Sequence, residues 1–112
     1  MQIQVRKHNL VMTDALLEHI ERRLNFSLGR FGVRLRTVVV NLHDLNGPKG
    51  GVDQECKLTM RTSWKSEIVI EERDADVFAA VARAADRAGR AVERQASLRY
   101  GSGPPGPART QF

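Results

Sequence analysis

Alternating apolar and polar positions predict four β-strands in this chain. Residues 2–7 place Ile3 and Val5 on one face and polar side chains on the other, which is typical of a half-buried strand. Residues 33–43 contain a run of β-branched side chains and are expected to form the longest and most buried strand, in the middle of a sheet. The other two strands are expected at residues 56–61 and 67–73.

Apolar residues at helical spacing predict a first helix between two of these strands. It begins after Thr13, whose hydroxyl suits an N-cap, with Asp14 at the positive end of the helix dipole. Gly29 ends it. The apolar stripe of this helix consists of Leu16, Leu17, Ile20, Leu24 and Leu28.

A second, alanine-rich helix is predicted after the last strand. Asp74 or Asp76 caps it, and it runs from about Val77 to about Leu98. Its predicted core side consists of Phe78, Val81, Ala85, Ala88 and Val92. The order of elements is therefore β-α-β-β-β-α.

Each helix and the sheet have one apolar face, which predicts an α+β fold. The simplest arrangement is a two-layer sandwich, a four-stranded sheet with two helices on one face. The 112 residues have room for one such domain, expected at residues 1–100. Turn residues at 44–51 and 62–66 predict the connections between the last three strands. The Gly/Pro-rich tail, residues 101–112, is expected to be flexible.

Four arginines of the second helix are spaced by four, three and four residues, so they fall on one stripe opposite the apolar side. This arginine row consists of Arg83, Arg87, Arg90 and Arg94. Guanidinium groups stay charged and pair with phosphate, so the row indicates nucleic-acid binding. The alternative is a solvated helix face that Asp86 and Glu93 partly neutralise.

The overall charge agrees with an anionic partner. Lys and Arg number 18 against 13 Asp and Glu, a formal net charge of +5. With both helices on one face of the sheet, Arg22 and Arg23 of the first helix are expected near the arginine row. The polar face of the third strand is also basic, through Lys57 and Arg61.

Several classes of function are not expected. His8, His19 and His43 lack the spacing of a zinc site, and Cys56 alternates with core residues, so we expect no metal, no cofactor and no catalytic residue. We therefore expect no enzyme and no small-molecule substrate. The chain has no apolar run of about 20 residues and no signal-like start, which predicts a cytoplasmic protein without a membrane partner. Phe26 and Trp64 could either stack on unpaired bases or cover the edges of the fold.

Three segments carry a resemblance to a known family: residues 2–10 with Thr-Asp-Ala-Leu at 13–16, the loop Asn-Gly-Pro-Lys-Gly-Gly-Val-Asp at 46–53 with Cys56, and the helix stretch Asp-Arg-Ala-Gly-Arg-Ala-Val at 86–92. They resemble the ribosome hibernation-promoting factor family, which includes the ribosome-associated inhibitor and is also labelled as a modulator of an alternative sigma factor. The resemblance covers about residues 1–98. It implies the same fold, and a factor that binds the 30S subunit or the 70S ribosome during stress.

In this family the binding site is the channel for messenger and transfer RNA, so the resemblance implies contacts to 16S ribosomal RNA. Carried onto this chain, the basic positions are Arg83, Arg87, Arg90, Arg94, Arg22 and Arg23, with Lys57 or Arg61 in addition. Two other functions remain open at this point. One is a protein-interaction regulator of transcription or of a sigma factor, and the other is a general single-strand RNA binder.

Overall fold

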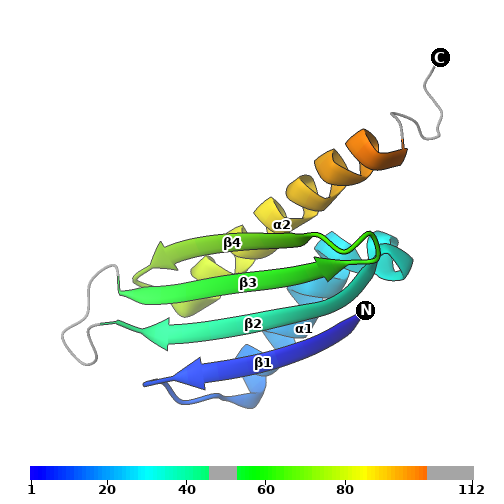
Figure 1. Cartoon of the computed structure of the whole chain (residues 1–112). Coiled ribbons are helices and arrows are strands. Elements are labelled where there is room, and N and C mark those ends of the chain that lie inside the picture. The colour runs from blue at the N-terminus through cyan, green and yellow to red at the C-terminus, as the bar shows by residue number, and fades with distance from the viewer. Residues whose placement is uncertain (46–52, 101–112) are drawn as a thin grey trace.

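A computed structural model describes residues 1–45 and 53–100 and has the predicted order of elements (Figure 1). The elements are β1 (Gln2–His8), α1 (Asp14–Leu28), the 3-10 helix η1 (Gly29–Arg34), β2 (Leu35–Asp44), β3 (Gln54–Thr62), β4 (Glu67–Asp74) and α2 (Val77–Tyr100). Most of the predicted loop at 44–51 and the whole predicted tail at 101–112 lie outside the described residues.

The four strands form one sheet in the order β1-β2-β3-β4, and both helices cover one of its faces (Figure 1). β1 is parallel to β2, and the other two pairs are antiparallel. The crossover from β1 to β2 passes through α1, as a parallel pair requires. The α+β sandwich predicted from the hydrophobic pattern is confirmed, including the central position of β2.

The core lies between the sheet and the two helices. Buried side chains come from both helices, η1, β2, β3 and β4, and β1 adds the partly buried Ile3 and Val5. The largest fully buried apolar side chains are Ile20, Leu24, Leu28, Val38, Val40, Leu42, Leu58, Met60, Val81 and Val92. On the sheet side of α2 the other core residues are alanines, so the helix backbone approaches the strands closely.

Cys56 is fully buried in this core, as its alternation with Leu58 and Met60 predicts. Burial raises the pKa of its thiol to about 12, and Glu55 and Glu72 add to the shift. Because the thiolate is the reactive form, we expect no labelling of native protein by a thiol reagent at pH 8, and one labelled thiol per chain after denaturation. Rapid labelling of the native protein would contradict the buried position.

Two expectations about individual side chains are wrong. Val33 belongs to η1 and is 93% exposed, because the short 3-10 segment delays the start of β2 to Leu35. Phe78 is 36% exposed and is not among the core residues. Its ring instead lies 5.0 Å from that of His19 on α1, between the centroids, because the first turn of α2 faces α1 there.

The ends of the helices follow the predicted capping chemistry. The Thr13 hydroxyl accepts a hydrogen bond from the Leu16 N–H at 3.1 Å. Both candidate caps of α2 are used: the Asp76 carboxylate accepts from the Phe78 N–H, and the Asp74 carboxylate accepts from the Asp76 N–H. These local bonds set where α2 begins.

Candidate nucleic-acid interface

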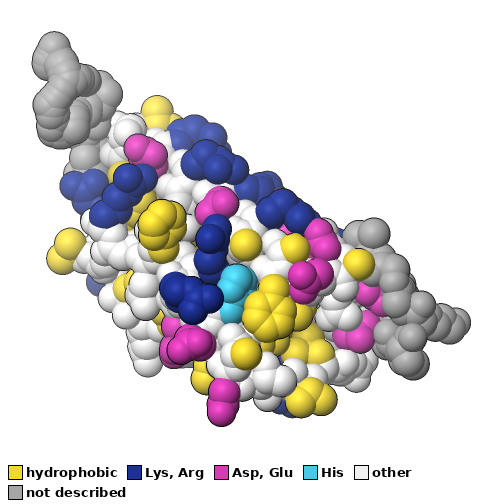
Figure 2. Space-filling view, turned by 180° about the vertical axis from the view of Figure 1, so that it is seen from behind, with side chains coloured by type: hydrophobic (Ala, Val, Ile, Leu, Met, Phe, Trp, Pro, Cys, Tyr) yellow, Lys and Arg dark blue, Asp and Glu magenta, His cyan; other side chains and the backbone are white. Residues whose placement is uncertain are grey.

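The arginine row runs along the outer side of α2, but its two halves have different surroundings. Figure 2 shows basic side chains following one another along one edge of the helical face, with acidic side chains near one end. Arg83 and Arg87 fold down onto β4, the neighbouring edge strand. Arg90 and Arg94 are exposed and form no ion pair within the described part of the chain.

Arg83 is held by three groups of β4. Its Nε donates to Glu72 Oε1 at 3.1 Å, its Nη1 to Asp74 Oδ2 at 2.7 Å, and its Nη2 to the Arg73 carbonyl oxygen at 2.7 Å. The Asp76 N–H and the Arg83 guanidinium hold the pKa of Asp74 below its usual range. The carboxylates in turn raise the pKa of Arg83.

Arg87 binds the same strand one helical turn later. Its Nη1 donates to the Glu71 carbonyl oxygen at 2.8 Å and to Glu72 Oε2. Glu72 therefore accepts from both arginines, and these hydrogen bonds, chiefly that of Arg87, lower its pKa despite its partial burial. Two backbone carbonyls of the edge strand are thereby capped by α2, which blocks pairing with another strand there.

The Glu72 contacts predict a dependence of stability on pH. A carboxylate with a lowered folded-state pKa stabilises the fold fully above the ordinary value of 4.5, and this stabilisation is lost as the pH falls through the lowered pKa. We expect Glu72→Gln to lower the melting temperature at pH 7 by a few degrees and to flatten its decline between pH 6 and 3. If the melting temperatures of the two proteins declined in parallel between pH 6 and 3, the prediction would be contradicted.

Arg23 lies between the two helices, where its partner is Asp86. Its Nη2 donates to Asp86 Oδ1 at 3.1 Å, and its side chain is 31% exposed. A second bridge joins Arg30 of η1 to Glu93 at 3.2 Å. The ion pairs of Asp86 and Glu93 are therefore with the arginines of α1 and η1, and not with the arginine row.

Arg22 stays on the solvent side of α1. Its only ion pair within the described residues is a loose one to Glu18 at 3.8 Å, and its side chain is 64% exposed. A phosphate can displace such a pair at small cost, since exposed ion pairs of this kind contribute little. Arg22 thus remains available for an anionic ligand.

Lys57 and Arg61 are not brought together with the arginine row. They alternate with the buried Cys56, Leu58 and Met60, so they lie on the face of the sheet opposite the helices. Arg61 pairs with Glu67 at 3.3 Å, and Lys57 lies in register between Asn41 and Glu71. A single flat ligand cannot contact both faces, so these two residues do not extend the helical surface.

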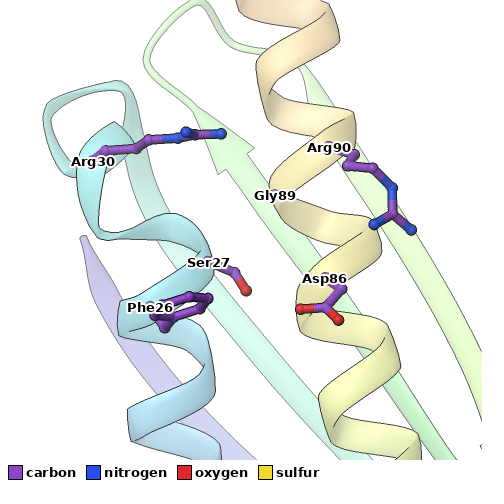
Figure 3. Close-up of a pocket in the computed structure, with 6 residues that line it drawn as sticks. All are labelled: Phe26, Ser27, Arg30, Asp86, Gly89 and Arg90. Carbon is purple, nitrogen blue, oxygen red and sulfur yellow. The ribbon is translucent and has the colours of Figure 1, made fainter.

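Gly89 of α2 packs tightly against Ser27 of α1. A Cβ at this position would lie 2.9 Å from the backbone carbonyl oxygen of Ser27. Beside this contact a hollow of about 240 Å³ lies between α1 and α2 (Figure 3). Phe26, Ser27 and Arg30 line one side, and Asp86, Gly89 and Arg90 line the other.

Sequence reasoning missed Arg30 as part of this surface. The residue follows Gly29, at which helical periodicity ends, and only η1 carries it back toward α2. Its guanidinium lies over the Phe31 ring, 4.7 Å from the centroid. The Gly29-Arg30-Phe31 sequence contains no signal for that placement.

A family model matches residues 3–99 of the chain, and its description is sigma 54 modulation protein / S30EA ribosomal protein. The chain belongs to this family. The resemblance identified from the three sequence segments is thereby confirmed. The residues matched by the S30EA family model include nearly all of the described structure, with α1 and the arginine row on α2 among them.

Solved structures agree with the S30EA assignment. The chain is 29% identical to the N-terminal domain of Protein Y from Thermus thermophilus, with a TM-score of 0.69 over 85% of this chain and 99% of that one. A ribosomal subunit interface protein from Coxiella burnetii has the same fold, with a TM-score of 0.73, 13% identity, and coverage of 87% and 99%. No curated protein matches the chain. Among the described helices, none is long and apolar enough to cross a membrane.

The structure brings two of the three histidines together. His8 and His43 are in register on β1 and β2, with ring centroids 4.5 Å apart. Within residues 1–45 and 53–100, no group of three or more His, Cys, Asp or Glu side chains is placed to hold a metal ion. The pair belongs to the sheet surface, remote from the arginine row.

Proposed function

We propose that this chain is a ribosome-associated translation inhibitor, a hibernation factor of the S30EA family, that acts in the cytoplasm under stress. The surface it uses is the outer side of α2 with the adjoining side of α1. Its target is 16S ribosomal RNA of the 30S subunit, in the channel for messenger and transfer RNA. The chemistry is binding without catalysis, and the action is to occupy the channel.

The observation that carries this proposal is the unpaired half of the arginine row. Arg90 and Arg94 are one helical turn apart, about 6 Å along the axis, and neither forms an ion pair within residues 1–45 and 53–100. Exposed guanidinium groups in line with one another bind a phosphate backbone and release its counterions. Family membership and the names of the two structural neighbours, a Protein Y domain and a ribosomal subunit interface protein, support a ribosomal target.

Arg83 and Arg87 belong to the proposed surface in a different capacity. Phosphates must compete there with Glu72 and Asp74, which already occupy the guanidinium donors. We therefore assign most of the attraction for RNA to Arg90 and Arg94, and the orientation of α2 on the sheet to Arg83 and Arg87.

Sedimentation through sucrose gradients tests the proposal. The purified chain should cosediment with 30S subunits and with 70S ribosomes, and the bound fraction should fall as salt rises, because each phosphate contact releases counterions. It should also stop cell-free translation at about one chain per ribosome. Equal affinity for ribosomes and for arbitrary single-stranded RNA would instead indicate a general RNA binder. Absence of cosedimentation at low salt would exclude the ribosomal function and favour a protein partner.

A further inference from the structure

The hollow between α1 and α2 combines groups of three different chemistries. An exposed phenyl ring, a carboxylate and the side chains of two arginines line it, beside the close contact of Gly89 with Ser27 (Figure 3). From this juxtaposition we propose that the hollow binds one unpaired nucleotide of an RNA strand, and that it prefers a base with an exocyclic amino group. The inference rests on the proposed function, since it takes RNA to lie along the arginine row.

Phe26 supplies the stacking surface. Its side chain is 81% exposed, although it is a large apolar group on a helix whose other large apolar residues are mostly buried. Every base has a flat face, so a phenyl ring at the edge of a basic groove binds an unpaired base by stacking. The neighbouring hollow gives the base room to lie against the ring.

Arg30 and Arg90 supply the phosphate contacts from opposite sides. Arg30 extends from η1 toward α2, whereas Arg90 lines the hollow from α2 and its guanidinium extends along the outer side of α2, away from α1 (Figure 3). Arg90 has no ion-pair partner among the described residues, and Arg30 uses a single nitrogen for Glu93. Each guanidinium has five N–H donors, so Arg30 retains donors for a phosphate oxygen.

Asp86 supplies the preference among bases. The carboxylate points toward α1 (Figure 3), and Arg23 donates to its Oδ1. Its Oδ2 has no hydrogen-bond partner within the described structure, and the side chain is 45% exposed. An ionised carboxylate only accepts hydrogen bonds. It therefore favours the exocyclic amino groups of adenine, cytosine or guanine over uracil, whose one base donor, N3–H, lies between two carbonyl oxygens.

Fluorescence anisotropy of labelled decamers of adenylate, cytidylate and uridylate at low salt tests the stacking. The wild type should bind the adenylate and cytidylate decamers about tenfold more tightly than the uridylate decamer. Phe26→Ala should weaken adenylate binding about tenfold. Val33→Ala, which truncates another exposed apolar side chain outside the hollow, is the matched control and should change nothing. Phe26→Trp should retain affinity, and its added fluorescence should be quenched by the decamer, compared with wild type whose one tryptophan is Trp64.

A second variant, Asp86→Asn, tests the base preference. In Asp86→Asn the side-chain oxygen stays with Arg23, and an NH2 group replaces Oδ2, so an acceptor becomes a donor. The preference over uridylate should then disappear or reverse. Melting temperatures of all variants establish that they are folded.

Three results would overturn the inference: no decamer binding by wild type, unchanged adenylate binding in Phe26→Ala, or a base preference that survives in Asp86→Asn. If wild type nevertheless cosediments with 30S subunits, the proposed function stands and only the nucleotide site is lost. If wild type prefers the adenylate decamer through Phe26 but does not bind ribosomes, the nucleotide site stands and the ribosomal function is lost.

Discussion

Replacing both Arg90 and Arg94 with Glu should weaken cosedimentation with 30S subunits by roughly a hundredfold at moderate salt. Each change removes one phosphate contact and adds repulsion from the same backbone. Replacing them with Gln should reduce the slope of log affinity against log salt by about one unit per lost contact. Neither arginine has a partner in the described structure, so the melting temperature should change by only a few degrees.

Lys57→Glu with Arg61→Glu is the matched control for this experiment. It changes the net charge by the same amount but lies on the opposite face of the sheet. A general electrostatic effect would weaken binding equally in both double variants, whereas a site on α2 predicts a much larger loss for the helical one. A folded Arg90→Glu, Arg94→Glu protein that still cosediments and inhibits translation would refute the assignment of the site.

The other half of the arginine row should respond differently to the same substitution. Arg83→Glu with Arg87→Glu removes both cations from Glu72 and Asp74 and places new carboxylates beside them. Like charges at close range destabilise, so the melting temperature should fall by more than in the Arg90 and Arg94 variant. Thermal melts of the two double variants, side by side, distinguish a structural pair of arginines from a binding pair.

Gly89→Ala should lower the melting temperature by roughly 5–15 °C, which corresponds to the 1–3 kcal/mol usually lost on overpacking a tight contact. The added Cβ would lie 2.9 Å from the Ser27 carbonyl oxygen, a backbone atom that cannot rotate away. The helices must therefore move apart. This outcome is opposite to the ordinary effect of the same change in a helix interior, where alanine stabilises by about 1 kcal/mol.

Gly29→Ala is the control for the glycine experiment. Gly29 has a right-handed backbone with φ −56°, and nothing lies within 4 Å of the position that its Cβ would occupy. The substitution should leave the melting temperature unchanged or raise it. If Gly89→Ala is as well tolerated as Gly29→Ala, then α1 and α2 are not in the close contact described.

The sequence alone predicted the order of elements, the single sheet with both helices on one face, and most of the core. These features follow from the spacing of apolar residues along each element, which is a local property. Capping was equally local, since Thr13 and Asp76 bond to groups two or three residues away. The errors at Val33 and Phe78 arose where a short 3-10 helix and a neighbouring helix, rather than the local period, set exposure.

The tertiary structure alone divided the arginine row. Helical spacing makes Arg83, Arg87, Arg90 and Arg94 equivalent, yet two of them meet the carboxylates of β4 and the other two extend past those partners. Likewise, Asp86 is an i,i+4 neighbour of Arg90 in sequence, but it pairs with Arg23, 63 residues away. An ion pair depends on the distance between two side chains in the folded chain. Sequence periodicity reports only the direction in which each side chain leaves its own helix.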